Sequence, residues 1–238
     1  MDDKEEMEKT YEMVRQSNLY DEAMQQYYVC ESLTDMRQDL GRMKAFSPGW
    51  LENQSIWLHM SYKFYLELLR GGLYKQFFEE IETGLVPFMD NDVYGRSPIE
   101  ASSFIVSSVF PDAKMHGEGF QARLSGSTAE FMSMYLIMMS GEKPFTVDDE
   151  GNLALEFKPV LPKWLWKENG TISYTFLGKT TVTYSVPEAE DSWKLGSAQS
   201  VTITYADGST VELKGGVISS KHAKAVRNGS VVSIVVTY

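Results

Sequence analysis

The chain has few or none of the residues and motifs that several classes of protein require. It holds one cysteine, Cys30, and three histidines among 238 residues, which excludes an internal disulfide and a cysteine-rich zinc site. The histidines, His59, His116 and His222, are too scattered for the spacing of a metal-binding motif. No glycine-rich nucleotide loop ending in Gly-Lys-Ser/Thr and no Gly-x-Ser-x-Gly nucleophile elbow occurs. The sequence therefore predicts no metal site and no resident cofactor.

Long apolar runs and an excess of positive charge are also missing. The longest apolar stretch, Phe131 to Met139, is far shorter than the ~18 residues that a membrane-spanning helix needs. The first residues, Met1 to Glu8, are mostly charged, unlike a secretory signal peptide. With 33 acidic and 22 basic residues, the net charge of −11 would repel a phosphate backbone. We therefore expect a cytoplasmic protein with no membrane and no nucleic-acid partner.

The residues that are present change in character near Gly141. Before that point helix-forming residues dominate, and the pattern predicts helices over residues 2–17, 22–28, 50–70 and 73–83. After it, polar and apolar residues alternate as they do in strands, over residues 171–176, 201–205 and 231–236. Asn-Gly and Asp-Gly pairs between these runs suit tight hairpin turns.

Helices followed by strands predict an α+β chain of two domains rather than alternating βα units. The first domain is helical and covers residues 1–141, and the second is an antiparallel β-sandwich or jelly-roll-like domain over residues 142–238. The helical half has few helices for an independent bundle that carries so many aromatic side chains. We therefore expect it to be part of a larger helical array.

The segment from Trp50 to His59 carries the first set of candidate site residues. If the segment is helical, Glu52, Ser55, His59 and Lys63 line one side of the helix. An acid, a hydroxyl, an imidazole and an ammonium on one side would suit a polar ligand cavity. The same stripe also fits an ordinary solvent-facing surface beside a buried histidine, and periodicity alone favours this second interpretation.

The segment from His116 to Phe131 carries the second set. It opens with a glycine-rich loop, and Ser127 with Glu130 forms a Ser-x-x-Glu capping box that predicts a helix beginning at Ser127. Amide groups at a helix start, beside the Ser125 hydroxyl and the unhindered backbone of Gly126, would cradle an anion. The alternative is an ordinary N-cap that follows a surface loop.

Four segments together resemble the end of the cellobiose phosphorylase family. They are FSPGWLENQSIWLH (46–59), YGRSPIEASSF (94–104), HGEGFQARLSGSTAEF (116–131) and LPKWLW (161–166). The likeness is closest to the 1,2-β-oligoglucan phosphorylases and extends over residues 44–180, while the remaining β region is similar only in pattern. It implies the C-terminal part of an (α/α)6 barrel followed by a β domain.

The resemblance also implies a reaction. In that family, inorganic phosphate attacks the anomeric carbon of a β-glucoside or β-glucan while an aspartic acid protonates the leaving oxygen, which gives α-glucose 1-phosphate with inversion. Phosphate is held by a histidine seven residues after a Glu-Asn pair, and by a hydroxyl-glycine pair before the last barrel helix. His59 matches the histidine, and Ser125 with Gly126 matches the hydroxyl-glycine pair. We therefore expect these three residues to bind phosphate.

The implied substrate-binding residues are Glu52 and Asn53, which match the Glu-Asn pair, and Arg123, which stands where many members carry Trp. Gln54 and Ser55 stand where better-known members have Gly-Gly, which is a departure from the family pattern.

The catalytic aspartic acid of the family lies well upstream of the histidine segment, and nothing before His59 resembles its setting. We therefore expect a glycoside phosphorylase fragment that contains no catalytic residue and is inactive alone. Its expected partners are a β-glucan or β-glucoside, phosphate as co-substrate, and either the missing N-terminal portion of the enzyme or a second copy. The alternative is a non-catalytic carbohydrate-binding or interaction module.

Overall fold

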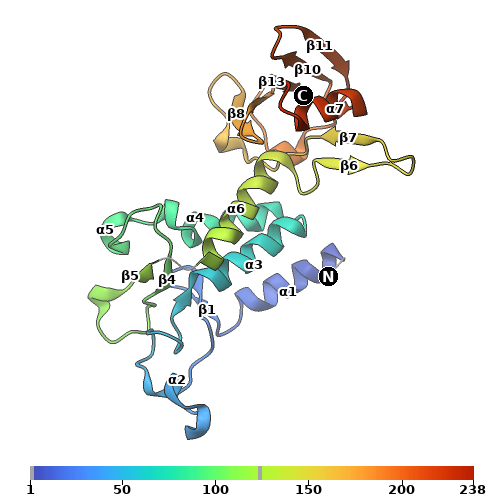
Figure 1. The fold of residues 1–238 in the computed structure, drawn as a ribbon. Helices are drawn as coiled ribbons and strands as arrows, with labels where there is room; N and C mark the ends of the chain where they lie inside the picture. Colours follow the sequence, from blue (N-terminus) through green and yellow to red (C-terminus); the bar gives the residue numbers. More distant parts are fainter. Residues whose placement is uncertain (1–2, 123–124) are drawn as a thin grey trace. The chain divides into compact units, whose positions relative to one another are not determined.

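The computed structural model describes residues 3–122 and 125–238. The chain is α+β and divides into two compact units, Met1–Met134 and Tyr135–Tyr238 (Figure 1). The division falls inside helix α6 (Ser125–Ser140), whereas the change in sequence character lies at Gly141. The described helices of the first unit do not close into a barrel.

Helices account for much of the first unit. They are α1 (Lys4–Arg15), α2 (Arg42–Ala45), α3 (Leu58–Arg70), α4 (Tyr74–Gly84) and α5 (Asn91–Tyr94), with the start of α6. Helix α1 is capped by Asp3, whose carboxylate accepts a hydrogen bond of 2.9 Å from Glu5 N. Between α3 and α4 the chain turns at Gly72, whose φ of +73° lies in the left-handed region that glycine adopts without strain. The helices expected over 2–17 and 73–83 are thus confirmed to within a few residues.

A two-stranded hairpin replaces the helix expected over 22–28. Strand β1 (Tyr20–Asp21) pairs antiparallel with β2 (Gln26–Tyr27). The Asp21 carboxylate accepts hydrogen bonds of 3.2 Å from the amides of Ala23 and Met24, which closes the turn. This side-chain turn chemistry overrides the helix propensity of the segment.

A buried carboxylate ties the helices of the first unit together. Glu80 of α4 is 1% exposed and accepts hydrogen bonds of 2.8 Å from the hydroxyls of Tyr11 and Tyr27, together with a contact from Arg15. These donors come from α1 and β2. Burial of a charge is tolerated when it is paired and hydrogen-bonded, as here. The Glu80 cluster thereby fixes α1 and the hairpin against α4.

The second unit is built on a five-stranded sheet. In spatial order its strands are β11 (Thr210–Lys214), β10 (Ser200–Tyr205), β13 (Val231–Thr237), β9 (Thr180–Ser185) and β8 (Thr171–Phe176). Three of them confirm the strands expected from alternating polarity. The pairing is antiparallel except between β13 and β9, which run parallel. This parallel pair departs from the all-antiparallel sandwich expected for residues 142–238.

A smaller sheet and a helix complete the second unit. The sheet has the order β12 (Val217–Ile218), β7 (Leu153–Glu156) and β6 (Phe145–Val147), and helix α7 (Ser220–Arg227) follows it. The pattern of strands did not predict α7, which is short and buries only Ala223 and Val226. The core contains nine fully buried side chains: Leu155, Leu161, Val182, Tyr184, Val201, Ile203, Ile218, Ala223 and Ile234.

No helix among residues 3–122 and 125–238 is both long and apolar enough to cross a membrane.

Candidate functional site

A three-stranded sheet in the first unit directs the two candidate segments to the same end of the sheet. Its strands are β3 (Ile56–Trp57), β4 (Ser102–Ile105) and β5 (Gly119–Ala122). Because β4 is antiparallel to both neighbours, β3 and β5 run in the same direction. The strand ends that lead to His59 and to helix α6 therefore emerge together, separated by two strand spacings or about 10 Å. The strand β5, hidden in the glycine-rich segment, was not predicted.

Aromatic rings lie in a row on one face of this sheet. Trp57 stacks on Phe104 at 5.8 Å between ring centroids, and Phe104 stacks on Phe120 at 5.7 Å. Trp50 meets the same row edge-on, at 5.2 Å from Phe104 and 4.7 Å from Phe120. These contacts hold the loop that follows Trp50 against the sheet.

This loop, residues 50–55, leads into β3 and is not helical, so helix α3 begins at Leu58 rather than at the expected Trp50. Leu51 and Gln54 have φ of 48° and 56°, which is uncommon for residues other than glycine. Their carbonyl groups are held from outside the loop: Leu51 O accepts from the Trp57 indole at 2.9 Å, and Gln54 O accepts from Ser107 Oγ at 2.5 Å. Such strained backbone persists only where surrounding contacts impose it, and it concentrates at functional sites.

The loop changes which candidate residues share a surface. Because residues 50–57 are not helical, Glu52 and Ser55 do not share a helix face with His59 and Lys63, and the expected four-residue stripe is wrong. Ser55 is fully buried, and its hydroxyl donates to Leu51 O within the loop, a structural role.

His59 lies in the first turn of α3. Its Nδ1 is buried and has no hydrogen-bond partner among the described residues. Its ring contacts the Trp57 ring edge-on at 5.7 Å. Burial, together with the nearby Lys63 ammonium, lowers the pKa of His59 below its usual 6.5. His59 is therefore mainly a neutral imidazole at pH 7.

Glu52 and Asn53 each offer a free hydrogen-bond acceptor. Glu52 Oε1 accepts from Arg42 Nη2 at 2.6 Å, while Oε2 is buried without a partner in the described structure. Asn53 is 4% exposed and donates from Nδ2 to Phe46 O at 2.7 Å, which leaves Oδ1 buried and also unpartnered. A ligand that satisfies both atoms has to bring donors, and hydroxyl groups do so.

The distribution of such atoms is informative. Six buried side-chain polar atoms in the described part of the chain lack a hydrogen-bond partner, and three of them belong to Glu52, Asn53 and His59. Buried polar groups are nearly always paired, so exceptions that fall close together in the sequence suggest a place where a ligand or ordered water supplies the partner. The other three belong to Gln26, Tyr65 and Glu80.

The second candidate segment starts helix α6, of which Ser125 and Gly126 are the first residues. The helix begins two residues before the expected Ser127, within the usual uncertainty of a helix end. Arg123 lies outside the described residues. A cavity of about 160 Å³ adjoins the first turn of α6 and is lined there by Ser127, Thr128 and Phe131. Tyr62 of α3 and residues of the segments 86–87 and 98–101 line the rest of it, and His59, Glu52 and Asn53 are not among its lining residues.

Sequence reasoning missed Arg42 and Ser107, which hold the site loop in place. Neither carries a sequence signal, because their contacts with Glu52 and Gln54 depend on how distant loops are folded. Residues 3–122 and 125–238 contain no group of three His, Cys, Asp or Glu side chains that would hold a metal ion. No family model matches the chain, and no curated protein matches it. Function has to be inferred from the chemistry of the site.

Proposed function

We propose that this chain is the C-terminal part of a glycoside phosphorylase that acts on β-glucosides or β-glucans with inorganic phosphate. In this proposal the first unit is a portion of an (α/α)6 barrel, and the second is the β domain that follows it. The chain contributes part of the phosphate and substrate site. The general acid comes from a polypeptide segment outside these 238 residues.

The observation that carries this proposal is the set of unpartnered polar atoms on Glu52, Asn53 and His59. The same three residues are singled out by the sequence resemblance, which uses no information on hydrogen bonding. The β3-β4-β5 sheet adds support, because the strand ends that lead to His59 and to the start of α6 lie at the same end of the sheet.

The two sides of the proposed site suit different groups of the ligand. The start of α6 presents backbone amides and the positive end of a helix dipole, which favour an anion such as phosphate. The His59 imidazole adds a hydrogen bond, and it gains a proton more readily beside an anion. Glu52 and Asn53 present acceptors instead, so they suit the hydroxyl groups of a sugar and would disfavour a phosphate.

Thermal unfolding with and without millimolar phosphate tests this proposal, with sodium chloride matching the ionic strength. A ligand that binds the folded state raises the melting temperature by mass action. We expect the melting temperature to rise in the wild-type chain and in His222→Ala. The His222 imidazole lies in the second unit, where it is hydrogen-bonded to Tyr205. The rise should disappear in His59→Ala. An equal rise in all three proteins would exclude His59 from the phosphate site.

A non-catalytic carbohydrate-binding or interaction module is the second candidate. The observation in its favour is that exposed apolar side chains occur on the helices of the first unit, with Met13 72% and Met60 50% exposed. Such side chains suit a protein partner. Saccharide or partner binding that phosphate does not change, combined with no phosphate-dependent rise in melting temperature, would favour this candidate.

A further inference from the structure

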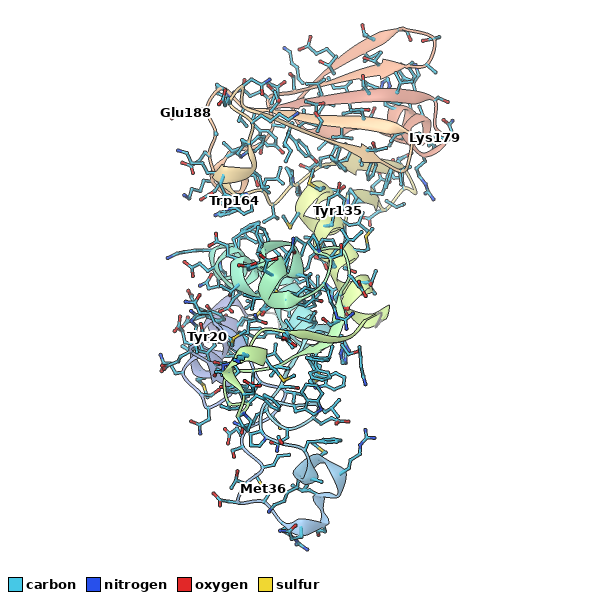
Figure 2. The ribbon with its side chains drawn as sticks, turned by 90° about the vertical axis from the view of Figure 1, so that its left-hand side faces the viewer. Tyr20, Met36, Tyr135, Trp164, Lys179 and Glu188 are labelled. Atoms are coloured by element: carbon cyan, nitrogen blue, oxygen red, sulfur yellow. The ribbon has the colours of Figure 1, made fainter. Side chains whose placement is uncertain are left out.

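A segment that projects from the first unit contacts Glu52 and Asn53, the two residues that carry the unpartnered acceptors of the site. We call residues 31–46 the α2 segment, because they surround the short helix α2. The segment projects in both views, and Figure 2 labels Met36 on it. Most of its side chains are exposed and only Leu33 is buried, so it has little core of its own. Its contacts with the site loop are therefore notable.

Two contacts join the α2 segment to neighbouring residues of the loop. Arg42 Nη2 binds Glu52 Oε1 at 2.6 Å, and Phe46 O accepts a hydrogen bond of 2.7 Å from Asn53 Nδ2. Each contact occupies one polar atom of a side chain and leaves the other as an acceptor, Glu52 Oε2 and Asn53 Oδ1. The α2 segment thus determines which polar atom of each side chain is left for a ligand.

The backbone beneath these side chains is fixed independently. Gly49 N donates to Asn53 O at 2.7 Å, and Cys30 Sγ donates to Glu52 O at 3.3 Å. With the backbone held in this way, the orientation of the Glu52 and Asn53 side chains depends on their contacts with the α2 segment.

We propose that Arg42 is a positioning residue for the saccharide: it holds Glu52 so that Oε2, like Oδ1 of the adjacent residue Asn53, accepts hydrogen bonds from sugar hydroxyls. This inference rests on the proposed function and deepens it, because it assigns the loop side of the site to a polyol. A guanidinium suits this role, since its planar fork fixes a carboxylate more rigidly than an ammonium does.

The chain offers a matched control for Arg42. Arg37 belongs to the same segment and is also exposed, but its partner is Asp39, at 2.8 Å within the segment. We would compare wild type with Arg42→Gln, Arg42→Lys and Arg37→Gln. The probes are a 1,2-β-linked glucose oligosaccharide, by titration calorimetry, and inorganic phosphate, by the shift in melting temperature.

We expect the Arg42 variants to bind the oligosaccharide more weakly while their response to phosphate is unchanged. Arg42→Gln should weaken the oligosaccharide about tenfold, as expected for losing one oriented charge-assisted hydrogen bond, and Arg42→Lys should weaken it less. Arg37→Gln should bind as wild type does. All variants should keep the phosphate response, which a general loss of structure would not preserve.

Two outcomes overturn the inference. The first is equal oligosaccharide affinity in Arg42→Gln and wild type, and the second is no oligosaccharide binding by wild type. The phosphate response and its loss in His59→Ala decide the proposed function separately, so the two failures are distinguishable.

Discussion

Two tyrosine substitutions in the first unit each remove one buried hydroxyl, and we expect them to have different effects on the free energy of unfolding. The Tyr27 hydroxyl donates to Glu80 Oε1 at 2.8 Å. The Tyr65 hydroxyl is buried against Gly84 and makes no hydrogen bond of normal geometry to any described residue, although Ser61 lies near it. Phenylalanine fills nearly the same volume in both places. The two variants therefore differ in whether the lost hydroxyl had a partner.

The magnitudes follow from that difference. Tyr27→Phe removes a hydrogen bond to a buried carboxylate and should lower the free energy of unfolding by about 2 kcal/mol. The loss is large because Glu80 is 1% exposed and water does not readily replace the donor. Tyr65→Phe removes a buried hydroxyl that lacks a partner. It should leave the free energy unchanged or raise it by about 1 kcal/mol.

Urea unfolding measures both values, with peptide-resolved hydrogen exchange of helix α4 identifying the transition of the first unit. This identification matters because the chain has two units and a single transition cannot be assumed. An unchanged midpoint in Tyr27→Phe would contradict the role of Tyr27 as a donor to Glu80. A loss in Tyr65→Phe as large as that in Tyr27→Phe would show that the Tyr65 hydroxyl does have a partner.

Two further predictions concern pH and backbone strain. Burial raises the pKa of Tyr174 to about 12, above the unfolded value of 10. The second unit should therefore lose about 2 kcal/mol of stability as pH rises from 10 to 12, which absorbance titration of tyrosinate with unfolding at each pH would follow. A pKa of 10 for Tyr174 would contradict its burial. Gly49 and Gly208 both have φ of +84°, but an added Cβ at Gly49 would lie 2.6 Å from Phe110 N, while none lies within 4 Å at Gly208. Gly49→Ala should therefore destabilise the chain more than the ~1 kcal/mol expected for Gly208→Ala, and equal losses in urea unfolding would refute the close approach.

Regular elements could be predicted from the sequence where one local signal was strong. Strands β8, β10 and β13 alternate polar and apolar residues and occur where expected. Helix α7 was missed because its eight residues lie among strands and bury only two side chains. The parallel pairing of β9 with β13 depends on contacts between distant parts of the chain, so no local pattern shows it.

The candidate site was only partly predictable. The motif identifies Glu52, Asn53 and His59, but the expected helix through residues 50–57 was wrong. The left-handed conformations of Leu51 and Gln54 depend on donors elsewhere, including Ser107, which is more than fifty positions away. Propensity describes short segments only, so it cannot anticipate a loop that tertiary contacts impose.

The most direct test of the proposed phosphate site is a proton NMR titration of the His59 imidazole with and without phosphate. Without phosphate, burial and Lys63 should hold its pKa below 6.5, so its contribution to stability is present at neutral pH and lost as pH falls through the folded pKa. Bound phosphate favours the imidazolium and should raise the pKa of His59. A His59 pKa that phosphate does not move would contradict the proposed site.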